Sequence, residues 1–180
     1  LERDAQGFPL DLIFVTGDLA QSGTADEYAL IEDFFRSLLS VTKVPRERVF
    51  VVPGNHDVDR ATGRFLLRTL ARDEDSIAFF EEARSRQFHA QKFSAYRKSR
   101  GSLLGEGRPH GLSVGDEAVE IVEIRGARIA VATFNSAWCA QGDDDQNNLW
   151  LGEPGVVRAL DRIGDSGASF AARARPSLRT

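Results

Sequence analysis

The sequence predicts an α/β fold in which a mixed β-sheet is flanked by helices. Two short apolar runs, at residues 11–16 and 49–52, have the length and composition of buried strands. The stretch between them places its apolar residues at helical spacing. A strand, a helix and a second strand in this order form a crossover unit, so we expect the two strands to be parallel.

The helix between the two strands is predicted to begin with a capping box. Thr24 is a favourable N-cap residue, and Glu27 stands three positions later, where its carboxylate can bond back to the N-cap amide. We expect the helix to run to about Ser40. The residues of its apolar face are Tyr28, Ile31, Phe34, Phe35, Leu38 and Leu39.

Polar side chains follow both strands through a glycine turn. Gly17-Asp18 comes directly after the first strand. Pro53-Gly54 ends the second strand, because proline lacks the amide donor and glycine allows a sharp turn. The three residues that come next are Asn55, His56 and Asp57. Since open α/β sheets bind ligands at the carboxyl ends of their strands, we expect these side chains to share one site.

The segment after the second motif is predicted to be an inserted helical cap of about residues 62–100. It contains a short helix at residues 65–70 and a longer helix that Asp75 caps. Residues 101–111 carry four glycines and a proline, so this segment is predicted to be a loop.

Two further apolar runs, at residues 118–124 and 127–134, predict a β-hairpin. Asn135 follows the second run, so it is another polar residue at a strand end and a candidate to line the site. Residues 153–163 are predicted to form a short helix with Pro154 in its first turn.

The end of the chain differs in composition from the rest. Residues 164–180 are rich in Ala, Arg, Ser and Gly, and their only β-branched residue is Thr180. We therefore predict a domain of residues 1–164, followed by a disordered or aberrant tail of residues 165–180.

Composition and charge argue against several classes of protein. An apolar fraction of 42% and a charged fraction of 28% are typical of a globular domain. The net charge of −4 gives no sign of a nucleic-acid partner. No run approaches the roughly 18 apolar residues of a membrane helix, so no membrane partner is expected. The single cysteine, Cys139, favours a reducing compartment, and we expect a cytoplasmic location.

The two motifs, taken together and in this order, resemble the calcineurin-like metallophosphoesterase family. They are residues 11–23, DLIFVTGDLAQSG, and residues 49–59, VFVVPGNHDVD. The resemblance covers about residues 10–163 and implies an α/β sandwich of mixed sheets with helices outside. It also implies hydrolysis of a phosphomonoester or phosphodiester substrate at a centre of two divalent metal ions, which would be Mn, Fe or Zn.

The resemblance further implies a role for each polar residue of the two motifs. Asp18 would bridge the two metals and Asn55 would bind one of them, and both side chains offer the hard oxygen donors that such ions accept. His56 would contact the phosphate and protonate the leaving group, since an imidazole exchanges protons near neutral pH. Asp57 would hydrogen-bond the imidazole. On the residues alone, Asp18 and Asn55 could be ordinary turn residues, and Asp57 could cap its local turn.

This sequence contains only part of the family's pattern. The family builds its site from five blocks, and the chain has the second and the third. It lacks the first, an Asp-x-His block, and the last two, a histidine and a Gly-His-x-His block. The chain also begins at Leu1 and contains no methionine. We therefore expect a fragment, open to fusion with further domains, in which metal binding and catalysis are weak.

A second hypothesis is a non-catalytic regulatory module of the same fold, which would bind a nucleotide or a partner. A plain nucleotide-binding domain is disfavoured, because no Gly-rich phosphate loop follows the first strand. The remaining polar candidates are expected to have surface or structural roles. They are His89, His110 and the acidic loop Asp143-Asp144-Asp145.

Overall fold

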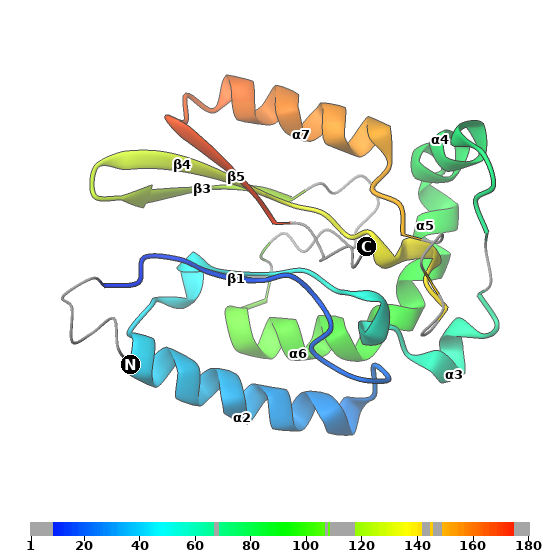
Figure 1. The fold of residues 1–180 in the computed structure, drawn as a ribbon, viewed down its shortest axis with the longest axis horizontal. Coiled ribbons are helices and arrows are strands. Elements are labelled where there is room, and N and C mark those ends of the chain that lie inside the picture. The colour runs from blue at the N-terminus through cyan, green and yellow to red at the C-terminus, as the bar shows by residue number, and fades with distance from the viewer. Residues whose placement is uncertain are drawn as a thin grey trace.

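In the computed structural model the chain forms two small sheets that lie between helices (Figure 1). The structure describes residues 9–66, 69–106, 108, 118–141, 145 and 149–174. The predictions for His110, Asp143, Asp144 and residues 175–180 concern positions outside this set. The predicted α/β sandwich, with helices outside the sheets, is confirmed.

The first sheet is the predicted crossover unit. Strand β1 (Ile13–Val15) pairs in parallel with β2 (Val49–Val51), and helix α2 (Ala25–Thr42) connects them. The predicted capping box is present, because the Glu27 carboxylate accepts the Thr24 amide at 3.0 Å. Both strands run toward the same side of the molecule, where their carboxyl ends meet (Figure 1).

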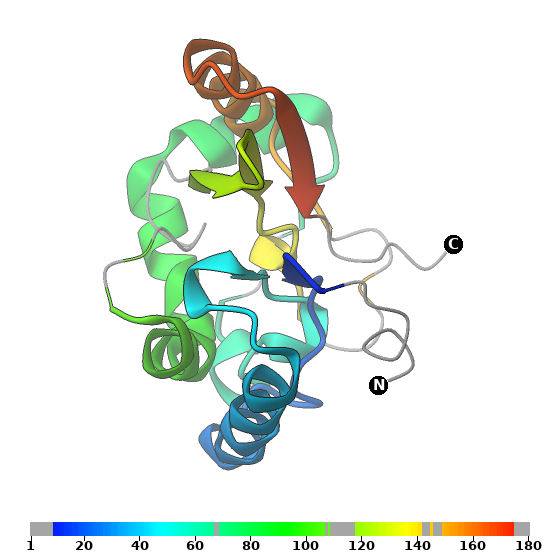
Figure 2. The ribbon, with the colours of Figure 1, turned by 90° about the vertical axis from the view of Figure 1, so that its left-hand side faces the viewer.

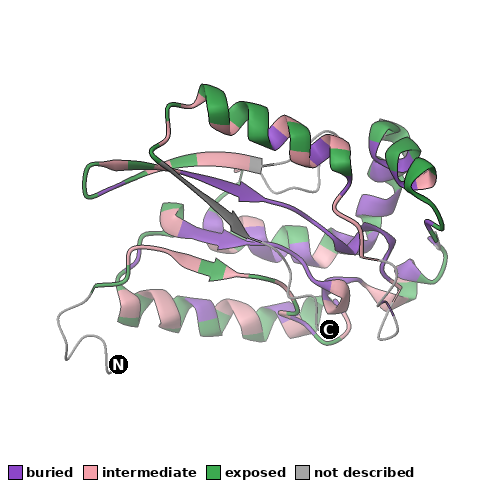
Figure 3. Cartoon of the chain, turned by 45° about the horizontal axis from the view of Figure 1, so that its top comes forward, coloured by how far each residue is buried: buried purple, intermediate pink, exposed green. Residues whose placement is uncertain are grey.

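Helix α2 covers the outer face of this sheet, as the two perpendicular views show (Figures 1 and 2). Its buried side chains are Tyr28 and Phe35, seven positions apart and therefore on one face. Phe34, predicted to lie on the same face, is 61% exposed, because it is turned by about 100° from Phe35. In Figure 3 helix α2 carries exposed, intermediate and buried residues, whereas strand β2 is buried along its whole length.

The insertion is helical, although its helices differ from those predicted. The short helix α3 spans Arg60–Gly63. The prediction of a helix at residues 65–70 is wrong for its described residues, 65, 66, 69 and 70, which are not helical. The reason is local, because the Asp59 carboxylate accepts the Ala61 amide at 2.9 Å and so starts the helix early.

The long helix predicted from Asp75 is divided in the structure into α4 (Asp73–Glu81), α5 (Ala83–His89) and α6 (Ser94–Leu104). The first break is at Glu82, whose backbone is extended. Helix α6 also enters the predicted loop 101–111, because Gly101 is accommodated inside its last turns. Packing of the insertion against the sheets therefore overrides the local sequence signals.

The insertion is anchored to the strand ends by a buried lysine. Lys92 is fully buried, and its ammonium donates to the carbonyl oxygen of Ala140 at 2.7 Å. Its own carbonyl accepts the Asp59 amide at 2.8 Å. Tyr96 adds a second anchor, since its hydroxyl donates to the carbonyl oxygen of Val51 at 3.0 Å. These bonds join the insertion directly to the segment that carries the second motif.

The buried lysine predicts that stability rises with pH. Burial lowers the pKa of Lys92 from 10.5 to about 8, while Cys139 and Asp145 act in the opposite direction. Between these two values the unfolded chain binds a proton that the folded chain does not, so folding becomes more favourable as pH increases. We expect the wild type to gain up to about 3 kcal/mol over Lys92→Met across this window. Urea unfolding of both proteins from pH 7.5 to 10 measures the difference, and parallel curves would contradict the prediction.

The second sheet contains the predicted hairpin and one strand that we did not predict. Strands β3 (Ala118–Ile124) and β4 (Ala127–Thr133) are antiparallel, and β5 (Phe170–Ala174) adds in parallel to β4. The prediction of a disordered or aberrant tail is therefore wrong for residues 170–174. Strand β5 pairs with β4 through main-chain hydrogen bonds, which require no β-branched side chain. The composition of residues 170–174 therefore did not indicate a strand.

Helix α7 (Glu153–Asp165) covers the second sheet and has Pro154 in its first turn, as predicted. Its Ala159 packs with Ala132 and Phe134 in a small second core. Within the described residues, no helix is both long enough and apolar enough to cross a bilayer.

Candidate active site

The two glycine turns that end β1 and β2 lie in backbone contact. A Cβ on Gly17 would stand 2.7 Å from the Cα of Gly54, and φ at Gly17 is +109°. A Cβ on Gly54 would stand 2.6 Å from the amide nitrogen of Asp18. Only glycine lets the two turns approach so closely. The structure thus brings the two motifs together, as their positions after parallel strands predicted.

Asp18 is held in an uncommon conformation at this contact. Its φ is +55°, in the left-handed region that residues with a side chain seldom occupy. Its Oδ1 accepts the main-chain amide of His56 at 3.3 Å, so the carboxylate lies against the second turn. Asp18 is exposed and Asn55 is half-buried, which leaves both side chains accessible at the edge of the sheet.

Asp57 is the centre of a buried hydrogen-bond network. Its carboxylate accepts the amides of Leu19, Ala20 and Gly54 at 3.3, 3.0 and 2.8 Å. It also accepts the hydroxyl of Tyr28 at 2.6 Å. A single side chain therefore joins the first turn, the second turn and helix α2.

This network is a different interaction from the bond to the His56 imidazole that the resemblance implies for Asp57, and that role stays a prediction. An ionised carboxylate offers about four lone-pair positions, and these four donors fill them. The carboxylate therefore joins its own turn to the first turn and to helix α2, which are distant in the sequence. Burial raises the pKa of Asp57, while its donors act in the opposite direction. Burial and the nearby Asp57 also raise the pKa of Tyr28, which keeps its hydroxyl protonated as a donor.

The half-buried ring of His56 contacts the loop after the first turn. Its Nδ1 lies 3.1 Å from the carbonyl oxygen of Gln21 and 3.3 Å from the side-chain nitrogen of the same residue. The Nη2 atom of Arg60 lies 3.4 Å from Nδ1. The ring therefore contacts Gln21 of the first motif and Arg60, which directly follows the second motif.

Asn135 is buried in a turn of its own at the end of β4. Its Oδ1 accepts the Ala137 amide at 2.8 Å, the pattern of an Asx turn. Its buried Nδ2 has no hydrogen-bond partner among the described residues. Strand β4 runs toward the same side of the molecule as β1 and β2 (Figure 1), and the lining role of Asn135 stays a prediction.

The described residues do not complete a metal site. Asp18 and Asn55 offer oxygen donors of the kind that divalent ions accept. Across residues 9–66 and the later described segments, however, no group of three or more His, Cys, Asp or Glu side chains could hold a metal ion. The oxygen donors of Asp18 and Asn55 are thus of the type that a divalent ion accepts, but two donors are too few to hold one.

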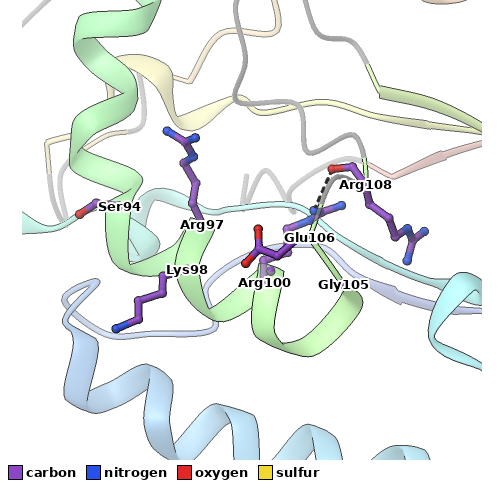
Figure 4. Close-up of a pocket in the computed structure, with 8 residues that line it drawn as sticks. Ser94, Arg97, Lys98, Arg100, Gly105, Glu106 and Arg108 are labelled. Atoms are coloured by element: carbon purple, nitrogen blue, oxygen red, sulfur yellow. Dashed lines mark hydrogen bonds between the residues drawn. The ribbon is translucent and has the colours of Figure 1, made fainter.

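A separate cavity of about 360 Å³ lies along helix α6, lined by Arg97, Lys98, Arg100 and Arg108 among others (Figure 4). Arg97 and Lys98 point to opposite sides of the helix in this view, so the cations do not converge on one point. Arg108 also donates to the carbonyl oxygen of Val49, at the start of β2. This cavity therefore lies away from the glycine turns, which follow the other end of that strand.

The parallel crossover unit brings Asp18, Asn55 and His56 together at one edge of the first sheet, while Asp57 is fully buried. The chain belongs to the calcineurin-like phosphoesterase family, since the model of that family matches residues 3–153. The match includes both glycine turns and the helical insertion. No significant match was found among curated proteins or among solved structures.

Three residues of the site were missed by sequence reasoning. Tyr28 was assigned to the apolar face of its helix, and the hydroxyl that bonds Asp57 gave no separate signal. Gln21 lies within the first motif and Arg60 directly follows the second, and the two residues meet only in the folded chain. The only sequence signal for these contacts was the basic residue Arg60, four positions after His56.

Proposed function

We propose that the protein acts as a metal-dependent phosphoesterase, which hydrolyses a phosphomonoester or a phosphodiester. The backbone contact between the two glycine turns carries this proposal, because it holds Asp18, Asn55 and His56 at one edge of the sheet. Membership of the calcineurin-like phosphoesterase family supports the general reaction class.

Each side chain has a separate task in the proposal. Asp18 and Asn55 contribute oxygen donors to the divalent ions, Mn, Fe or Zn. His56 contacts the substrate and donates a proton to the oxygen of the leaving group. Asp57 is a positioning residue, which holds the two turns in register through its buried hydrogen bonds. Asn135 is proposed to line the substrate side of the site.

The proposal predicts hydrolysis of bis(p-nitrophenyl) phosphate or p-nitrophenyl phosphate that depends on Mn²⁺ and on Asp18. We expect Asp18→Ala to lose activity by about 100-fold or more, since even residues that only support metal ligands cost about 10- to 100-fold. Release of p-nitrophenol measures the rate. Asp161→Ala, which removes an exposed carboxylate from helix α7, is the matched control and should keep full activity. Hydrolysis that survives in Asp18→Ala would contradict the assignment.

The incomplete ligand set favours a second candidate, a regulatory module that binds a nucleotide or a partner without hydrolysis. Among the described residues no group of three or more His, Cys, Asp or Glu side chains could hold a metal ion, and a module that does not hydrolyse its ligand needs no such group. Thermal unfolding with and without a nucleoside triphosphate tests this candidate. A stabilised chain that hydrolyses none of the esters above, with or without Mn²⁺, would favour the module over the enzyme.

A further inference from the structure

We infer that helix α2 is the surface through which two copies of this chain associate, with their two α2 helices packed side by side in antiparallel directions. The contact surface is a stripe of Leu30, Phe34, Ser37 and Val41 on the exposed side of the helix, which we call the α2 stripe. The inference concerns the outside of the first crossover unit, so it depends on neither metal nor phosphoesterase activity.

The α2 stripe is apolar although it is exposed. Leu30, Phe34 and Val41 are 74%, 61% and 54% exposed. Single exposed apolar side chains are ordinary, but these three lie within about 40° of one another around the helix axis. They therefore form one continuous apolar surface, and a surface of this kind on a globular domain indicates an interaction site.

The α2 stripe faces away from the neighbouring helix. Helix α6 packs beside α2 (Figure 1), and there the carboxylate of Glu32 accepts the hydroxyl of Ser102 at 3.2 Å. Glu32 is turned by about 160–180° from Leu30, Phe34 and Val41. The insertion therefore covers the opposite side of α2 and leaves the stripe open to a second molecule.

The spacing of the α2 stripe is complementary to itself. Its four positions are separated by 4, 3 and 4 residues, the spacing at which paired helices meet, and this order is the same in both directions along the helix. A two-fold axis between residues 35 and 36 places Leu30 against Val41 of the second copy and Phe34 against Ser37. Ser37 is small, and its hydroxyl donates to the carbonyl oxygen of Asp33 at 3.1 Å, so the phenyl ring packs on a satisfied residue.

The charges of α2 favour a second copy in the antiparallel direction. Asp26 and Glu27 lie in the first turn, whereas Lys43 caps the end of the helix and Arg46 follows it. Antiparallel packing brings the acidic end of each helix to the basic end of the other, while parallel packing brings like charges together. One helix from each copy makes a small interface, so we expect a dissociation constant in the micromolar range.

Sedimentation equilibrium of the 180-residue chain, from micromolar to near-millimolar concentration, tests the association. We expect a reversible dimer, and Phe34→Glu should raise its dissociation constant by about 30-fold or more, the effect of losing a central anchor. Phe88→Glu is the matched control, because it places the same charge at a phenylalanine of α5 that is 56% exposed. It should leave the dissociation constant unchanged. Circular dichroism reports whether each variant is folded.

Disulfide trapping tests the direction of the two helices. The double variant Leu30→Cys/Val41→Cys should form a covalent dimer under mild oxidation, because the two positions face each other across the axis. Each single variant should stay unlinked, since its two copies lie about 16 Å apart along the helices and a disulfide needs Cα atoms within about 7 Å. The native Cys139 is buried, and the wild type controls for it.

Four results would overturn the inference. A monomer over the whole concentration range would exclude association, and an unchanged dissociation constant in folded Phe34→Glu would place the contact elsewhere. Covalent dimers of the single cysteine variants would show parallel packing. A monomer in which Phe34 is protected from hydroxyl radicals would assign the α2 stripe to another segment of the same chain.

Discussion

Asp57→Ala is expected to destabilise the fold by about 3–5 kcal/mol, the cost of breaking a buried charged network. The substitution leaves the amides of Ala20 and Gly54 and the hydroxyl of Tyr28 without their acceptor in a buried position. A domain of this size is stable by only about 5–15 kcal/mol, so much of the population should unfold. Urea unfolding followed by circular dichroism measures the loss.

Two variants isolate the effect of the Asp57 carboxylate. Asp57→Asn keeps the volume but turns an amide donor toward other donors, so it should lose most of the same stability. Asp59→Ala removes a neighbouring aspartate that only caps helix α3, and it should cost about 1 kcal/mol. If Asp57→Ala were as mild as Asp59→Ala, the central role of this network would be wrong.

Gly54→Ala is expected to separate the two turns and abolish activity. The new methyl group would stand 2.6 Å from the Asp18 amide, and it would also overlap the Asp18 carboxylate. The backbone of Gly54, with φ of −99°, is allowed for alanine, so the effect would come from the contact alone. Overpacking of this kind costs about 1–3 kcal/mol. Unfolding and hydrolysis should both be measured, because the loss of activity should exceed the loss of folded protein.

Gly164→Ala is the matched control for Gly54→Ala. Gly164 lies near the end of helix α7, and a Cβ there would meet nothing within 4 Å. Alanine is the better helix former, so this substitution should stabilise the chain by up to about 1 kcal/mol and leave hydrolysis unchanged. Equal effects of the two substitutions would refute the close contact between the turns.

Sequence reasoning located the candidate site because its signals are local. Each motif is a short apolar run, a glycine turn and a polar residue, and the parallel pairing of Ile13 with Val49 then brings the two ends together. The partners of Asp57 could not be found in this way. Three of its four donors belong to Leu19, Ala20 and Tyr28, which lie 29 to 38 positions earlier in the chain.

The errors in the fold have similar physical causes. Strand β5 forms because β4 offers a parallel edge, a property of the partner strand that the composition of residues 170–174 does not carry. The break at Glu82 between α4 and α5 has no glycine or proline to announce it. Both elements are decided by tertiary packing, which local propensity cannot represent.

The location of Asp57 also limits how independently the segments around the site can move. One carboxylate ties together segments from β1, α2 and β2, so no single loop can swing away while the others stay in place. Separating the two turns would require the whole crossover unit to come apart, as one cooperative unit of unfolding. The rigidity of the candidate site therefore depends on the folding of the first half of the chain as a whole.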